Sequence, residues 1–138
     1  MSFNGILNVY KPKGFTSRDI VNIVRKIYNT KKVGHAGTLD PNATGVLPIA
    51  IGNATKIVDY IQAMGKSYIG EMTLGIETDT LDIWGKSIDS KVINYNKNIF
   101  FDVIQNYDNK KIMQMPPMFS ALKKDGKRLY ELARNGIE

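Results

Sequence analysis

The sequence predicts a mixed α/β (α+β) domain in which helices alternate with strands. Two short apolar runs, at residues 5–10 and 46–51, are typical of strands. Between them, apolar residues recur every three or four positions over residues 20–28, which is the spacing of an amphipathic helix. The chain has 138 residues, 43% of them hydrophobic and 23% charged, and this composition suits one soluble domain with a buried core.

The first strand is expected to end at Lys11, because the residue before a proline resists the helical conformation and Pro12 follows. Thr16 and Asp19 then have the spacing of a capping box, with Asp in place of the usual Glu or Gln. The helix also carries three basic residues, expected on its wetter surfaces in contact with either phosphate or water: Arg18, Arg25 and Lys26.

The second strand, residues 46–51, contains Pro48, whose missing N–H predicts a position near a sheet edge or at a bulge. A helix is expected next, with Asn53 as its N-cap and Gly65 as a left-handed C-cap. Residues 66–74 alternate well enough in polarity to predict a further strand.

A second series of short elements is predicted from residue 78 onward. Residues 78–82 are acidic and turn-like, and residues 99–107 have a helical pattern. Asp-Gly within residues 123–128 favours a tight hairpin with positive φ. A final helix is expected over residues 129–134, with Gly136 closing it.

The net charge of +6 is distributed unevenly. Residues 1–32 carry +6, residues 33–109 carry −4 and residues 110–138 carry +4. A basic surface attracts nucleic-acid phosphates, but lysines also serve solubility, so charge alone leaves both interpretations open.

Several classes of protein are disfavoured by composition. The chain has no cysteine and one histidine, which removes disulfides and the common zinc-ligand patterns, so no metal is expected. No apolar run approaches the roughly 18 residues of a membrane span, and the N-terminus does not resemble a secretory signal. These features are compatible with a cytoplasmic protein that does not contact a membrane.

Residues 34–45 place one carboxylate, Asp40, in a loop rich in glycine, beside the only histidine. Glycine supplies backbone geometry that other residues resist, and Pro41 fixes its own φ while restricting Asp40. The pattern predicts a shaped loop that presents Asp40, although the same residue types also form ordinary turns.

Further motifs accompany this loop in a fixed order. They are residues 11–17, 52–56, 66–68, 78–82 and 114–123. Together with residues 34–45, they resemble the tRNA pseudouridine(55) synthases of the TruB family along nearly the whole chain. The resemblance implies a mixed, largely antiparallel sheet with flanking helices, the catalytic core of a pseudouridine synthase, and a substrate uridine at position 55 in the T-loop of tRNA.

By this resemblance Asp40 is the catalytic aspartate, in the motif Gly-Thr-Leu-Asp-Pro. Pseudouridine formation detaches uracil from ribose C1′ and rejoins it through C5, so no cofactor or metal is implied. The reaction needs a carboxylate that attacks the sugar or stabilises positive charge at C1′, or that assists a glycal route by taking a proton from C2′. The sequence leaves these routes open.

The same resemblance assigns substrate contacts to His35 and Tyr68, the latter as the aromatic face that stacks on an extruded base. Without it, Tyr68 would be interpreted as a core residue and His35 as a structural hydrogen-bonding group. The remaining candidates are expected to support the loop or to contact RNA: Lys11, Pro12, Thr38, Lys56 and Asp82.

The resemblance also implies that residues 1–138 form the N-terminal portion of a catalytic domain. The family's later motif, with an arginine that pairs with the aspartate, and its C-terminal RNA-binding domain are expected to be absent. Two alternatives to a tRNA enzyme stay open: a non-catalytic RNA-binding fragment, and a guide-RNA-dependent relative. Oligomeric state is not predicted. Phosphate-binding glycine motifs are missing, which disfavours a nucleotide-dependent enzyme.

Overall fold

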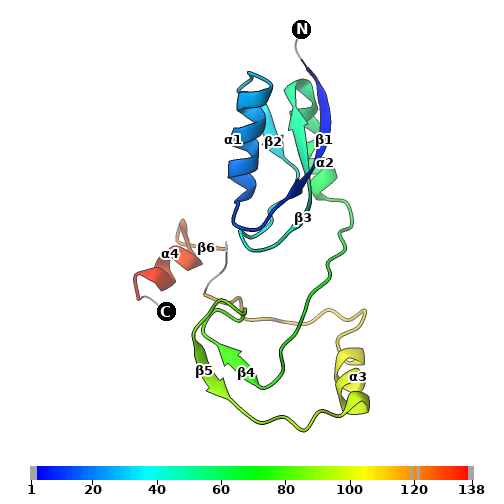
Figure 1. The fold of residues 1–138 in the computed structure, drawn as a ribbon, viewed down its shortest axis with the longest axis vertical. Helices are drawn as coiled ribbons and strands as arrows, with labels where there is room; N and C mark the ends of the chain where they lie inside the picture. The colour runs from blue at the N-terminus through cyan, green and yellow to red at the C-terminus, as the bar shows by residue number, and fades with distance from the viewer. Residues whose placement is uncertain (1–2, 119, 121, 137–138) are drawn as a thin grey trace. The chain divides into compact units, whose positions relative to one another are not determined.

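The computed structural model describes residues 3–118, 120 and 122–136, and divides the chain into two compact units, Met1–Tyr68 and Ile69–Glu138 (Figure 1). The first unit contains three strands, one long helix and two short helical segments. In chain order these are β1 (Gly5–Lys11), α1 (Ser17–Ile27), β2 (Val33–His35), β3 (Gly45–Ile51), the 3-10 helix η1 (Gly52–Ile57) and α2 (Val58–Gln62).

Helix α1 begins with the predicted capping box. The backbone N–H of Asp19 donates to the Thr16 hydroxyl at 3.1 Å, and the Asp19 carboxylate accepts from the Thr16 backbone N–H at 2.8 Å. These bonds satisfy two donors that every helix start leaves open. The Thr16 hydroxyl also donates to the Asp19 carboxylate at 2.6 Å, and this bond is the main cause of the lowered pKa of Asp19, followed by the bond from the Thr16 N–H.

The three strands form one antiparallel sheet in the order β1-β3-β2. The prediction that Pro48 lies near an edge or bulge is wrong, because β3 is the middle strand. Pro48 pairs with Asn8 of β1, and its carbonyl accepts from the N–H of Ala36 at 2.9 Å. Because proline has no N–H, Pro48 cannot donate a hydrogen bond toward β2. The pairing of β2 with β3 ends at the neighbouring pair, His35 and Ile49.

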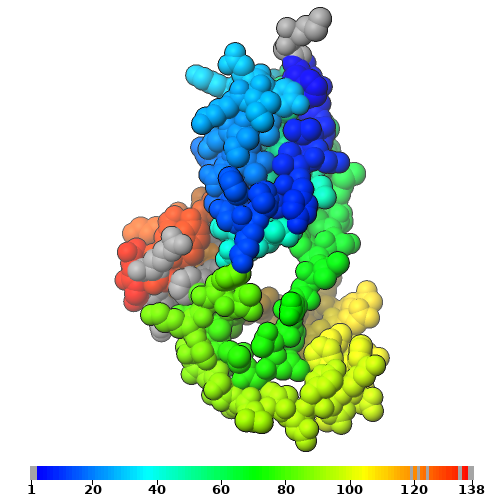
Figure 2. Space-filling view, in the orientation of Figure 1, coloured from blue at the N-terminus to red at the C-terminus, as the bar shows by residue number. Residues whose placement is uncertain are grey.

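The core of the first unit lies between α1 and the sheet (Figure 1). Figure 2 shows the outer surface of the chain, with the N-terminal segments in blue. It consists of Ile20, Val21, Val24, Val33, Leu47, Ile49 and Ile51. Each such side chain contributes roughly 1.5–3 kcal/mol when fully buried. The apolar face of α1 is narrower than predicted, since Ile27 is 72% exposed. Arg25 is half-buried, and one guanidinium nitrogen donates to the Val33 carbonyl at 3.2 Å.

The chain after β3 departs from the sequence prediction. A helical segment follows, but Asn53 does not cap it, because its side-chain oxygen accepts from Lys32 Nζ at 2.8 Å. Helix α2 ends at Gln62, with Ala63 as C-cap, so Gly65 is not the C-cap either. Residues 66–74 form no strand. A strand requires a hydrogen-bonded partner, and none pairs with this segment among the described residues.

The second unit has two small antiparallel sheets and two helices. Its elements are β4 (Ile76–Thr78), β5 (Ser87–Ser90), α3 (Lys97–Gln105), β6 (Lys123–Lys124), β7 (Lys127–Arg128) and α4 (Leu129–Arg134). The hairpin prediction is confirmed, since Asp125 and Gly126 have φ of 53° and 82°. The prediction of the last helix is also confirmed, and Gly136 after it has φ of 71°.

All strand pairs of the described residues are antiparallel, which confirms the predicted mixture of helices and antiparallel strands. They form three separate sheets rather than one. Among the described residues, no helix is both long and apolar enough to cross a membrane.

Candidate active site

The loop that joins β2 to β3 carries Asp40 (Figure 1). The Asp40 carbonyl accepts from the N–H of Ala43 at 3.1 Å, which closes a turn with Pro41 at its second position. The side chain of Asp40 is exposed, and no hydrogen bond or ion pair engages its carboxylate within the described parts of the chain. The loop therefore presents a carboxylate that the fold itself does not use.

Lys11 anchors the residue after Asp40. Its side chain is 0% exposed, and its ammonium group donates to three carbonyl oxygens: Phe15 at 2.7 Å, Pro12 at 3.1 Å and Pro41 at 3.1 Å. An ammonium group has three donors, so each finds one acceptor and the cost of burying the charge is offset. The Pro41 carbonyl also accepts from the N–H of Gly14 at 2.8 Å.

Ser17 anchors the residue before Asp40. It is the first residue of α1 and is 4% exposed. Its hydroxyl accepts from the N–H of Leu39 at 3.0 Å and lies 3.3 Å from the Leu39 carbonyl, to which it donates. The Leu39 side chain packs against the core of the unit. Asp40 thus lies between two residues whose backbone is tied to β1 and α1.

The sequence predicted the supporting role of Lys11 and Pro12 but not that of Ser17. Pro12 is exposed and contributes its carbonyl to Lys11. The pair Thr16-Ser17 has the composition of a helix cap, and Thr16 does perform that role. Ser17 belongs to the motif at residues 11–17, but that motif assigned it no role of its own, and its hydroxyl was not needed for the cap.

His35 is the last residue of β2, pairs with Ile49 and is half-buried. Its carbonyl accepts from Gln62 Nε2 at 3.5 Å. Its ring nitrogen Nδ1 is buried and has no hydrogen-bond partner within the described residues. A buried polar atom without a partner is unusual in a folded protein.

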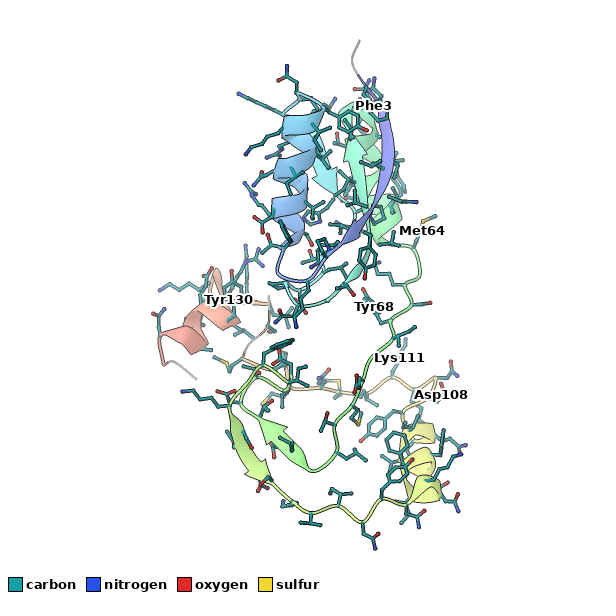
Figure 3. The ribbon with its side chains drawn as sticks, in the orientation of Figure 1. Phe3, Met64, Tyr68, Asp108, Lys111 and Tyr130 are labelled. Atoms are coloured by element: carbon teal, nitrogen blue, oxygen red, sulfur yellow. The ribbon has the colours of Figure 1, made fainter. Side chains whose placement is uncertain are left out.

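The other candidates of the first unit lie on its surface. Thr38 and Lys56 are exposed, the former in the Asp40 loop and the latter in η1. Tyr68 is 71% exposed on the segment that follows Met64 (Figure 3). No hydrogen bond or ring contact joins Tyr68 to Asp40 in the described part of the chain. The structure therefore brings Lys11, Pro12 and Asp40 together and leaves Tyr68 on a separate exposed segment.

Asp82 belongs to the second unit, in the turn between β4 and β5. Its carboxylate accepts from the Thr80 hydroxyl at 2.7 Å and from the backbone N–H groups of Trp84 at 2.9 Å and Gly85 at 3.2 Å. The hydrogen bond from Thr80 is the main cause of its lowered pKa. Asp82 therefore shapes its own turn.

Within the described residues, no three side chains of His, Asp or Glu cluster as metal ligands would. The expectation that the reaction needs no metal stays a prediction. Two positions of the motif at residues 114–123, Phe119 and Ala121, lie outside the described residues.

The fold and the site define the class of protein as an α+β domain with one exposed carboxylate on an anchored loop. Residues 25–138 match the family described as TruB family pseudouridylate synthase (N terminal domain), and the chain belongs to this family.

Curated relatives are similar over nearly the whole chain. The chain is 51% identical to tRNA pseudouridine synthase B of Alkaliphilus oremlandii over 98% of its length, which is 45% of that relative. It is 48% identical to the protein of the same name from Bacillus subtilis strain 168 over 98% of the chain and 44% of the relative. The chain therefore spans less than half the length of these relatives.

A solved structure supports the fold. In the crystal structure of a Cbf5-Nop10-Gar1 complex, one chain is 29% identical to this protein, with a TM-score of 0.57. The match covers 88% of this chain and 31% of the other.

Proposed function

We propose that this chain carries the catalytic loop of an enzyme that isomerises uridine to pseudouridine at position 55 in the T-loop of tRNA. The observation that carries the proposal is the exposed carboxylate of Asp40 between two anchored neighbours, Leu39 and Pro41. Similarity to relatives named tRNA pseudouridine synthase B supports it. On this proposal residues 1–138 form the N-terminal portion of the catalytic domain.

The chemistry requires a carboxylate near the sugar. Breaking the bond between C1′ and N1 develops positive charge at C1′, and Asp40 either bonds to C1′ or takes a proton from C2′. The uracil leaves with the electron pair of the bond to N1, turns, and bonds to C1′ through C5. This step displaces Asp40 from C1′ in the first route and is accompanied by return of the proton to C2′ in the second. C5 then loses its proton and N1 gains one. The product has the same atoms and the same oxidation state as the substrate. The proposal therefore needs the carboxylate of Asp40 and no cofactor.

The substrate uridine must leave its RNA stack to reach the carboxylate. An exposed ring can replace the lost stacking, and Tyr68 has 71% of its surface free to do so. His35, which is half-buried, is assigned a contact with the displaced nucleotide. Lys56 and Thr38, both exposed, are assigned contacts with the RNA backbone.

The test uses a T-loop stem-loop transcript with tritium at uridine C5, because tritium is released when C5 forms the new bond. The protein is assayed as the 138-residue chain and as the product of its whole reading frame. Asp40→Asn and Asp40→Ala are expected to abolish release. Asp59→Asn removes the same charge from an exposed residue of α2 and is expected to retain it.

Tritium release by Asp40→Asn at the wild-type rate would overturn the role of Asp40. RNA binding without release by every form would favour a non-catalytic RNA-binding fragment. Release only when a guide RNA and its partner proteins are added would favour a guide-RNA-dependent relative. The relatives' names support free tRNA as the substrate. The proposal also has the enzyme act in the cytoplasm.

A further inference from the structure

We infer that Ser17 is a positioning residue that holds Asp40 in its reactive orientation. The inference rests on the proposed function and names a residue of the same site that does not itself touch the substrate.

The geometry joins Ser17 to both polar backbone groups of Leu39. The hydroxyl accepts from the Leu39 N–H at 3.0 Å and donates to the Leu39 carbonyl at 3.3 Å. A serine hydroxyl has one donor and can accept at the same time, so both bonds are compatible with one rotamer. Ser17 is 4% exposed, which limits competition from water.

The bond to the Leu39 carbonyl also orients Asp40. The peptide unit is planar, so the Leu39 carbonyl, the Asp40 nitrogen and the Asp40 Cα lie in one plane. A hydroxyl that fixes the carbonyl oxygen fixes this plane. On the other side, Pro41 has a restricted φ and a carbonyl held by Lys11 at 3.1 Å. The side-chain torsions of Asp40 are then its main remaining freedom.

The element that carries Ser17 is itself rigid. Helix α1 is anchored to the sheet through the buried side chains of Ile20, Val21 and Val24. Its first turn is closed by Thr16 and Asp19 without help from the Ser17 side chain. The hydroxyl of Ser17 is therefore available for the loop, and functional groups supported from a packed helix are placed more accurately than those supported from a loop.

The experiment compares Ser17→Thr with Ser17→Val in the whole reading frame's product. Thr and Val have nearly the same shape, so crowding by the added methyl groups affects both and only the hydroxyl differs. We expect kcat for tritium release to be about 10- to 100-fold lower in Ser17→Val than in Ser17→Thr, since small misplacements of reacting groups cost this much. KM is expected to change little, because the RNA contacts remain.

A second readout is amide hydrogen exchange at Leu39, measured by NMR. We expect exchange there to be at least about 10-fold faster in Ser17→Val than in Ser17→Thr, because the amide then lacks its acceptor. Ile51→Val is the control for general destabilisation: it removes buried core at the end of β3 away from the Asp40 loop, and it is expected to leave kcat at the folded protein's wild-type value.

Equal kcat in Ser17→Thr and Ser17→Val, with an active wild type, would overturn the inference alone. A loss confined to KM would also overturn it, since that result assigns Ser17 to binding. A kcat loss of the same size in Ile51→Val would reduce Ser17 to a structural role. An inactive wild type would overturn the proposed function and the inference with it, so the two failures are distinguishable.

Discussion

The ammonium group of Lys11 donates a 3.1 Å hydrogen bond to the carbonyl of Pro41 and so ties the end of β1 to the residue that follows Asp40. The two residues are thirty positions apart in the chain. Because the Lys11 side chain is 0% exposed, this bond lies beneath the loop rather than on its surface. Lys11 therefore holds the loop in place from inside the fold.

We expect Lys11→Met to destabilise the protein by roughly 3 kcal/mol, because the change leaves carbonyl oxygens in a buried place without their donor. Urea unfolding followed by circular dichroism measures this loss. Lys31→Met is the matched control, since Lys31 is exposed. Similar stability of the Lys11 and Lys31 variants would contradict the buried role of Lys11.

Substitutions of Tyr68 distinguish stacking by its ring from a role of its hydroxyl group in RNA binding. We expect Tyr68→Leu to weaken binding of the T-loop transcript by about 1–3 kcal/mol, the usual value of one base-aromatic stack. Tyr68→Phe keeps the ring and is expected to bind like the wild type. Filter binding at fixed salt measures both. Equal binding by Tyr68→Leu and the wild type would remove Tyr68 from the substrate contacts.

The stability supplied by the capping box is expected to depend on pH. The hydrogen bonds of Asp19 lower its pKa below the ordinary value of 3.8. Their contribution is therefore fully present above that value and is lost as the pH falls through the folded pKa. The difference in urea midpoint between the wild type and Asp19→Asn should shrink as the pH is lowered from 6 to 2.

Asp59→Asn serves as the comparison for Asp19, because Asp59 is exposed and its carboxylate has no hydrogen bond among the described residues. The urea midpoint of Asp59→Asn is expected to equal that of the wild type at both pH 6 and pH 2. A difference for Asp19→Asn that stays constant down to pH 2 would show that the charge of Asp19 adds nothing to the cap.

Gly52 is expected to resist substitution. Its φ is +64°, and a Cβ there would lie 2.6 Å from the Phe3 carbonyl oxygen and collide with the side chain of Asn4. Gly52→Ala should therefore cost more than the roughly 1 kcal/mol of the left-handed conformation alone. Thermal unfolding of this variant measures the loss.

Gly65→Ala and Gly126→Ala are controls that separate the cost of the left-handed backbone at Gly52 from the cost of the steric contact. Gly65 has open space around it and no positive φ, so alanine there should be neutral or slightly stabilising. Gly126 has φ of +82° and open space, so it reports backbone strain alone. If Gly52→Ala costs no more than Gly126→Ala, the steric contact with Phe3 is unimportant.

The amino-acid sequence by itself determined the elements whose signals are local. The strand that ends at Lys11, the capping box of Thr16 and Asp19, and the Asp-Gly hairpin each depend on residues a few positions apart. The family motif around Asp40 belongs here too, because it is a contiguous pattern that residues 25–138 match.

Only the tertiary structure decided which of these residues meet. Pro48 occupies the middle strand because β2 ends beside it, and residues 66–74 form no strand because a strand depends on a partner from elsewhere. The bond from Ser17 to Leu39 spans 22 positions and that from Lys11 to Pro41 spans 30. Such contacts follow from how α1 and β1 pack around the loop, and no local pattern encodes that packing.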